Sequence, residues 1–159
     1  MKKNKATKLW AIILIIVVIL FGILIFSKRI DKNKELDMTQ ISNIITEKGE
    51  FAQILTTDID KEMLKNEMKF DVSNIDEVVG KKPLVNTSSS MFLILKVSNG
   101  QQESVKQQLE QYGEKYEMQW SNYLPDQYEL VKERKIGIRS NYVYLIISKN
   151  NEEIEKEIK

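Results

Sequence analysis

The side chains available for chemistry in this chain are carboxylates, hydroxyls and lysines, because the sequence contains neither cysteine nor histidine. Without cysteine there is no disulfide, no thiolate metal site and no thiol nucleophile. Without histidine the commonest general base is missing, so neither a Ser-His-Asp triad nor a Cys-His pair can be built. We therefore predict no catalytic residue, no metal site and no cofactor.

Two short stretches resemble the beginnings of reactive sites. "DIDKE", residues 58–62, alternates carboxylates as a calcium loop does. An EF-hand loop starting at Asp58 needs glycine and glutamate where this chain has Met63 and Lys69, so an acid-rich helix start is the favoured interpretation. "NTSSS", residues 86–90, could offer a serine nucleophile to a lysine base, but a polar turn between strands is favoured.

Two further arrangements could bind or cleave a polymer. A pair among the 23 acidic residues could serve a glycosidase, although no aromatic cleft is evident. Five aromatic residues could form a platform for a sugar or a peptide, namely Tyr112, Tyr116, Trp120, Tyr123 and Tyr128. The first three have helical spacing, which favours a place in the core.

The stretch "YLPDQY" gives the most specific local motif, with Tyr123, Pro125 and Tyr128. Proline disfavours helical geometry at the preceding residue, so a helix should end near Leu124. Proline is also favoured at the first position of a helix, so a new turn should begin at Pro125. We predict a structural corner in which both tyrosine rings pack against the sheet; a binding site is the alternative.

Charge is distributed unevenly along the chain. Every acidic residue lies at Asp31 or later, whereas six of the 24 basic residues precede it. Residues 31–159 therefore carry 18 basic and 23 acidic residues, a net charge of −5. Such a domain lacks the clustered positive charge that a phosphate backbone needs, and we predict no nucleic-acid partner.

Residues 9–26 contain no charged side chain, and as a helix they would span about 27 Å, close to the thickness of a bilayer's hydrocarbon core. We predict a single transmembrane helix that contacts the lipid bilayer, preceded by a basic tail, 1–8. No small-residue cleavage site follows, which favours an uncleaved signal anchor. The flanking basic residues balance, and the short tail favours an internal N-terminus. Residues 27–38 then form a juxtamembrane linker, and residues 39–159 an extracytoplasmic domain in the cell envelope.

Hydrophobic periodicity predicts the elements of this domain. They are helices over 39–55, 60–69 and 100–123, strands over 76–85 and 91–97, a hairpin over 135–148, and a charged, frayed helix over 149–159. Gly49 either ends the first helix or weakens it. In the hairpin, Asn141 is suited to the positive φ of a tight turn. Residues 91–97 are apolar on both faces, which predicts a central strand covered on both sides. The fold class is α+β, with an antiparallel sheet of about four strands and helices packed against one side.

The C-terminal half resembles the family called domain of unknown function 4358. The resemblance covers 60–159, is clearest in 100–148, and rests on Tyr123, Pro125 and Tyr128 followed by Asn141, Tyr142 and Val143. This chain departs from the family at Ser140, where a glycine is common, and at Met91, where an acidic residue is common. The resemblance implies a small bacterial envelope protein, either a lipoprotein or a single-pass protein, and no particular chemistry.

These observations favour a non-enzymatic interaction or scaffolding module at the bacterial cell envelope, with a protein partner. The candidate binding or structural residues are Tyr123, Pro125, Tyr128, Asn141 and Tyr142. Two alternatives remain open. One is a cell-wall enzyme that uses carboxylates, and the other is a regulatory partner of another membrane protein, coupled through residues 9–26.

Overall fold

The computed structural model describes residues 10, 13–22 and 35–159. The chain divides into two units, Met1–Glu35 and Leu36–Lys159. In the first unit, the described residues 13–22 are helical and their side chains are exposed. Among the described residues no helix has the length and apolar character needed to cross a membrane. The rest of the predicted transmembrane segment 9–26 lies outside the described residues.

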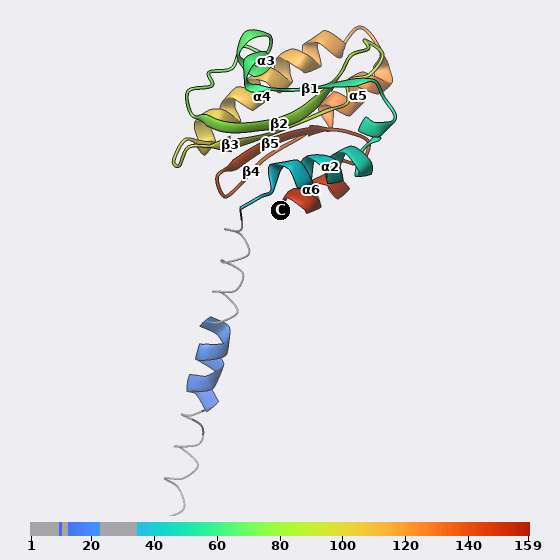
Figure 1. Ribbon diagram of the computed structural model, residues 1–159. Coiled ribbons are helices and arrows are strands. Elements are labelled where there is room, and N and C mark those ends of the chain that lie inside the picture. The colour runs from blue at the N-terminus through green and yellow to red at the C-terminus, as the bar shows by residue number, and fades with distance from the viewer. Residues whose placement is uncertain (1–9, 11–12, 23–34) are drawn as a thin grey trace, which may run out of the picture. The chain divides into compact units, whose positions relative to one another are not determined.

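The second unit is built on one antiparallel sheet of five strands (Figure 1). Along the chain these are β1 (Thr56–Asp58), β2 (Ile75–Pro83), β3 (Met91–Val97), β4 (Lys135–Arg139) and β5 (Tyr142–Ile147). In space their order is β1-β2-β3-β5-β4. The strand missing from the sequence prediction is β1. It pairs with the end of β2, where Pro83 lies opposite Thr56. Proline has no N–H to donate, and at this end of the strand no such donor is needed.

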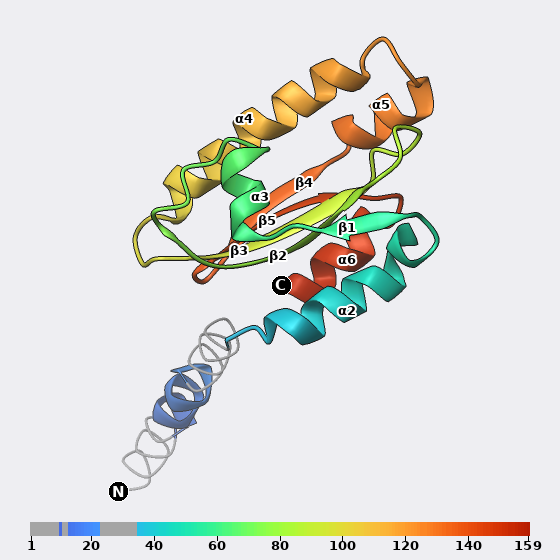
Figure 2. The same ribbon diagram turned by 45° about the horizontal axis from the view of Figure 1, so that its top comes forward.

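Helices cover both faces of this sheet, so the prediction of a single helical layer is wrong (Figure 2). The α-helices are α2 (Met38–Lys48), α3 (Lys61–Asn66), α4 (Gln102–Trp120), α5 (Pro125–Lys132) and α6 (Asn151–Ile158), with a short 3-10 helix, η1 (Glu50–Ala52). One face packs against α3, α4 and α5, and the other against α2, η1 and α6. The second layer is needed because β3 and β5 are apolar on both sides.

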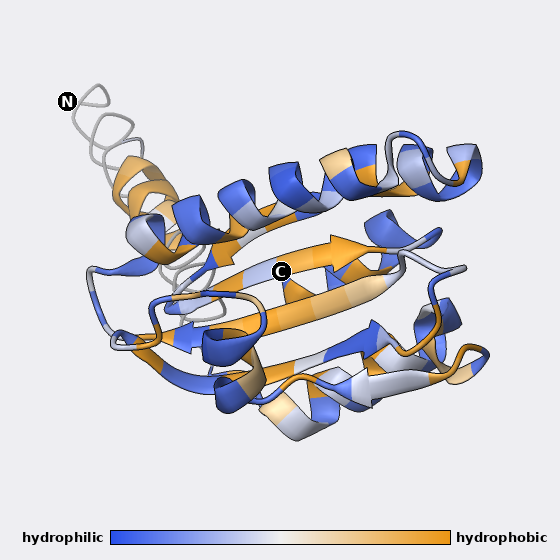
Figure 3. Cartoon of the chain, turned by 90° about the horizontal axis from the view of Figure 1, so that it is seen from above, coloured by the Kyte–Doolittle hydropathy of each residue, from blue (hydrophilic) through white to orange (hydrophobic). Residues whose placement is uncertain are grey.

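The two central strands make the core, as their sequences predict. Every residue of β5 is buried, and so is every residue of β3 except Lys96. Leu93 and Leu145 lie in the cluster beneath α4, whereas Phe92 and Tyr144 lie in the cluster beneath α2 and α6. Figure 3 shows the hydrophobic colour gathered on the central strands, while the helices are largely hydrophilic on their outer surfaces.

The C-terminal helix is an integral part of the second layer, so the prediction of a frayed tail is wrong. Ile154 and Ile158 are fully buried, four residues apart on one face of α6. The Tyr144 hydroxyl donates a hydrogen bond to Glu155 over 2.7 Å and joins α6 to the sheet. Two isoleucines are therefore enough to dock a helix whose other residues are mostly charged.

The first helix of the domain is shorter than predicted. Asp37 caps it by accepting hydrogen bonds from the amides of Thr39 and Gln40. It ends at Lys48 because Gly49 is extended and leads into η1, which buries Phe51. Leu55, which the helical pattern placed on the apolar face, is exposed instead.

The hairpin turn between β4 and β5 places its strained residue one position earlier than predicted. Ser140, not Asn141, adopts a positive φ of 52°. Glycine, which the family resemblance leads one to expect at position 140, adopts such a conformation without steric cost.

Candidate functional site

The corner between α4 and α5 is organised by Pro125. The helix α4 ends at Trp120, four residues before the predicted position near Leu124. Leu124 is extended, with φ −128° and ψ 109°, as expected for a residue before proline. Pro125 is the first residue of α5, where its missing N–H is not needed. The first hydrogen bond of α5 runs from the Tyr128 amide to the Leu124 carbonyl, over 2.9 Å.

Where these two helices meet, they enclose an open groove of about 280 Å³. Its lining residues are Glu114, Glu117, Met118, Ser121 and Tyr128. The Met118 side chain is 67% exposed, while the Tyr128 ring is half-buried against the core. The volume lies below the range of about 300–1,000 Å³ usual for small-molecule sites. The groove is therefore a small, open hollow with room for only a few atoms of a ligand.

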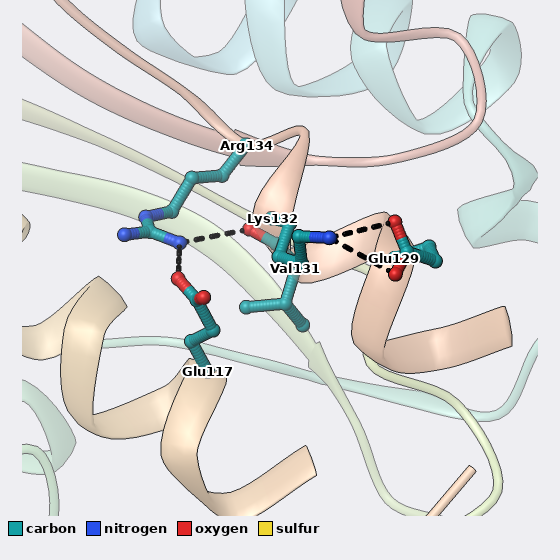
Figure 4. A network of polar contacts seen from close by, with 5 residues as sticks. All are labelled: Glu117, Glu129, Val131, Lys132 and Arg134. Atoms are coloured by element: carbon teal, nitrogen blue, oxygen red, sulfur yellow. Dashed lines mark hydrogen bonds and ion pairs between the residues drawn. The ribbon is translucent and has the colours of Figure 1, made fainter. Parts of the chain in front are cut away.

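The wall of the groove is held by an arginine that follows α5 (Figure 4). Arg134 donates from Nη1 to Oε2 of Glu117 over 2.6 Å and to the carbonyl oxygen of Val131 over 3.0 Å. Its side chain lies directly on α4 at Gly113, where a Cβ atom would be only 2.6 Å from Nε. The glycine thus permits a close contact that fixes the spacing of the two helices.

Lys132 supports Tyr128 from α5 itself. Its Nζ lies 3.0 Å from both carboxylate oxygens of Glu129 and 5.2 Å from the centroid of the Tyr128 ring. The hydrogen bond with Glu129 raises the pKa of Lys132, so this side chain stays charged. An exposed pair of this kind adds little stability, because solvent screens the two charges. Its main effect is that the positive charge of Lys132 is compensated by Glu129 within α5.

The five candidate residues do not form one site. Tyr123, Pro125 and Tyr128 come together at the corner, but Asn141 and Tyr142 lie at the opposite end of the sheet, where β5 begins. That end is also where α4 starts, and α4 is about 28 Å long. Tyr142 is fully buried in the other layer, and its hydroxyl accepts a hydrogen bond from the Leu36 amide over 3.0 Å.

Tyr123 differs from the prediction that its ring packs against the sheet. It is 53% exposed, and its ring lies 5.7 Å from that of Trp120. It is the last ring of a row that continues through Tyr116 and Tyr112 to Phe70, with neighbouring centroids 5.8–6.1 Å apart. Burial raises the pKa of Tyr112 and of Tyr116. The middle of the row thus belongs to the core, as the helical spacing predicts.

A buried polar cluster lies at the end of the sheet next to the corner between α4 and α5, and the sequence prediction missed it. The serines of "NTSSS" are buried rather than exposed. Glu50 accepts hydrogen bonds from the hydroxyls of Ser90, over 2.6 Å, and Ser148, over 2.9 Å. Burial acts to raise the pKa of Glu50, but these hydrogen bonds outweigh it and leave the pKa below its usual value. A carboxylate with a lowered pKa is a weak base, so the cluster does not favour an activated serine.

The same serines fix the position of α5. The Ser89 amide donates to Oε1 of Gln127 over 2.8 Å, and the Ser89 hydroxyl donates to the Gln127 carbonyl over 3.1 Å. The Tyr116 hydroxyl donates to the Ser89 carbonyl over 3.4 Å, which connects α4 to the same loop. Ser89 therefore links the loop before β3 to α4 and α5, the two helices of the groove.

The acid-rich stretch 58–62 also has a structural use. Asp60 caps α3 by accepting a hydrogen bond from the Met63 amide over 2.7 Å, and Asp58 pairs with Lys81. Across the described part of the chain, no group of three or more carboxylates is close enough to hold a metal ion. The interpretation of this stretch as a helix start is confirmed.

Comparison with known proteins identifies one family. The model of a family described as "Domain of unknown function (DUF4358)" matches residues 52–148, a range that includes the whole groove. No curated protein matches the chain. No solved structure matches it either.

Proposed function

Since this chain belongs to the DUF4358 family, whose description assigns no activity, we propose that it is a membrane-anchored interaction module of the bacterial cell envelope. In this proposal the module is non-enzymatic and binds a protein partner through the groove between α4 and α5. One observation carries it, namely the exposed Met118 beside the half-buried Tyr128 in the groove between the two helices. Exposed apolar side chains around a hollow are typical of protein-binding surfaces.

The electrostatics give little support to an enzyme. A carboxylate-dependent hydrolase needs an acid whose pKa is raised. Among the described residues, three carboxyl groups have a shifted pKa, and in each of them the shift is downward: Glu50, Asp71 and Glu155. None of the three lines the groove. Binding without chemistry is the function that agrees best with these values.

Membrane anchoring is supported by the first unit. Residues 9–26 carry no charge, and the described helical part, 13–22, exposes its apolar side chains. The folded unit starts at Leu36, next to the buried hydroxyl of Tyr142. The groove lies towards the other end of α4. A partner would therefore be met away from the point at which the chain enters the domain.

The proposal can be tested by photo-crosslinking of the full-length chain in native membranes. A benzophenone-bearing residue is introduced at Ser121, which lines the groove but contributes neither apolar nor charged groups to it. The matched control carries the same residue at Glu47, an exposed position on α2 in the other layer. We expect an adduct of higher mass from Ser121 that is absent from Glu47. Equal adducts from both positions, or none from Ser121, would contradict the proposal.

A further inference from the structure

The geometry points to the chemistry of the partner. We infer that the groove accepts a peptide segment that inserts an apolar side chain between Met118 and Tyr128 and places a lysine or arginine next to Glu114. This inference rests on the proposed function and adds to it the class of segment that is bound. The inference requires two features of the groove. One is an apolar contact surface formed by Met118 and Tyr128, here called the apolar seat, and the other is an uncompensated negative charge beside it.

The apolar seat is formed by a flexible side chain and a fixed ring. Met118 projects from α4 with two thirds of its surface exposed, and methionine adapts its shape to the side chain that it contacts. The Tyr128 ring is held on one side by the core and by the ammonium group of Lys132. A partner side chain of moderate size would bury both residues without a change in the backbone.

The charges around the groove are not balanced. Both cations on the α5 side have partners within the domain, since Arg134 pairs with Glu117 and Lys132 pairs with Glu129. Glu114 is exposed on the α4 side, and among the described residues its side chain has no ion-pair partner within 4 Å. Lys115, the next residue, is exposed too, but it lines another hollow, beside Phe70 and Tyr112. Among the residues that line the groove itself, the charge that remains for an incoming segment is therefore negative. A lysine or arginine on the partner would complement it and speed the encounter.

Other occupants fit less well. A nucleic acid or an anionic membrane surface would be repelled by Glu114 and by the net charge of −5 on residues 31–159. A small molecule would find less space than such ligands usually occupy. A protein segment that combines an apolar and a cationic side chain satisfies both features.

The test uses the crosslinker at Ser121 in full-length chains that also carry one substitution. Glu114→Lys reverses the charge in the groove, and Glu47→Lys makes the same change on α2, so both have the same net charge. Met118→Gln removes the apolar seat without adding charge. Both Glu114 and Glu47 are exposed, and thermal melting verifies that each variant folds. We expect Glu114→Lys to lower the adduct yield about tenfold at low salt, which corresponds to about 1.4 kcal/mol. Met118→Gln should lower it as well, whereas Glu47→Lys should leave it unchanged.

The outcomes separate this inference from the proposed function. An adduct whose yield is unaffected by Glu114→Lys and by salt would overturn the inference while the binding function stands. The absence of any adduct from the unsubstituted groove would overturn the binding function itself. Peptide mapping gives an independent readout, because the crosslinked partner segment should carry lysine or arginine close to the attached residue. An adduct with a second copy of this chain would overturn the assignment to a separate protein.

Discussion

A glycine in an edge strand provides the sharpest test of how the two layers are packed. Gly137 of β4 lies opposite Tyr144 of β5. A Cβ atom at Gly137 would lie 3.0 Å from Cε1 of the tyrosine ring and closer still to Cζ and the hydroxyl oxygen. The ring cannot move aside easily, because Tyr144 is 1% exposed and its hydroxyl is bonded to Glu155. The substitution Gly137→Ala should therefore force the ring and α6 apart.

The expected loss of stability is about 2 kcal/mol. Overpacking a core in this way costs about 1–3 kcal/mol, and a displaced hydrogen bond to the charged Glu155 costs about 1.5–3 kcal/mol if it is lost. Replacing a strand glycine with alanine gains about 0.5–1 kcal/mol from chain entropy, which offsets part of this. For a folded unit of this size, about 2 kcal/mol corresponds to a decrease in Tm of about 8 °C.

The assay is urea unfolding of the purified chain, measured for Gly137→Ala, Tyr144→Leu and the double variant. Tyr144→Leu is destabilising by itself, but it removes the atoms that the new methyl group would meet. Adding Gly137→Ala in that background should raise stability by about 0.5–1 kcal/mol, the entropic gain alone, so the pair should be strongly non-additive. Equal losses from Gly137→Ala in both backgrounds would show that the contact with the ring is not the cause, and the reasoning would be refuted.

Substitutions at three other positions test separate features of the fold. Tyr128→Ala should cost about 2 kcal/mol in urea unfolding, less than the 3–5 kcal/mol of a fully buried aromatic residue, while Tyr128→Phe should be nearly neutral; equal losses would point to the hydroxyl instead. Ser140→Gly should stabilise the chain by about 0.5 kcal/mol, since it relieves a positive φ, and a lower Tm would contradict this. Glu50→Gln should destabilise the chain at pH 7. Because the folded pKa of Glu50 is lowered, that difference should shrink as the pH falls below 4.5, and a pH-independent difference would show that its charge is not involved.

The sequence predicted the central part of the fold well, because strong local patterns and tertiary packing agree there. "MFLILKV" is apolar at alternate positions on both sides, which is possible only for a strand covered on both faces. The stripe from Val105 to Trp120 predicted α4 in the same way, and its members are the residues that contact the core. These elements needed no knowledge of their neighbours.

The peripheral elements depend on their neighbours and were predicted poorly. β1 has the sequence Thr-Thr-Asp, which carries no apolar pattern, and it is a strand only because β2 offers it an edge. In α6 most residues are charged, and the two isoleucines become decisive only when a second apolar face of the sheet is present to receive them. The sequence prediction placed helices on one face of the sheet only. It therefore offered no apolar surface for the C-terminal helix and predicted that this helix is frayed.

The residues of the groove were likewise predicted only in part from the sequence. Tyr123, Pro125 and Tyr128 were found because they lie within six residues of one another, but the residues that shape the groove are joined across the chain, such as Glu117 and Arg134. One signal for this was present in the sequence.

That signal is Gly113, which lies inside a long helical pattern, where glycine costs about 1 kcal/mol relative to alanine. A glycine in such a place needs a packing reason, and here the reason is the Arg134 side chain lying on the helix. The same contact sets the distance between α4 and α5, and therefore the width of the groove that we propose as the binding site. The cost of a glycine inside α4 is thus linked to the geometry of the groove between α4 and α5.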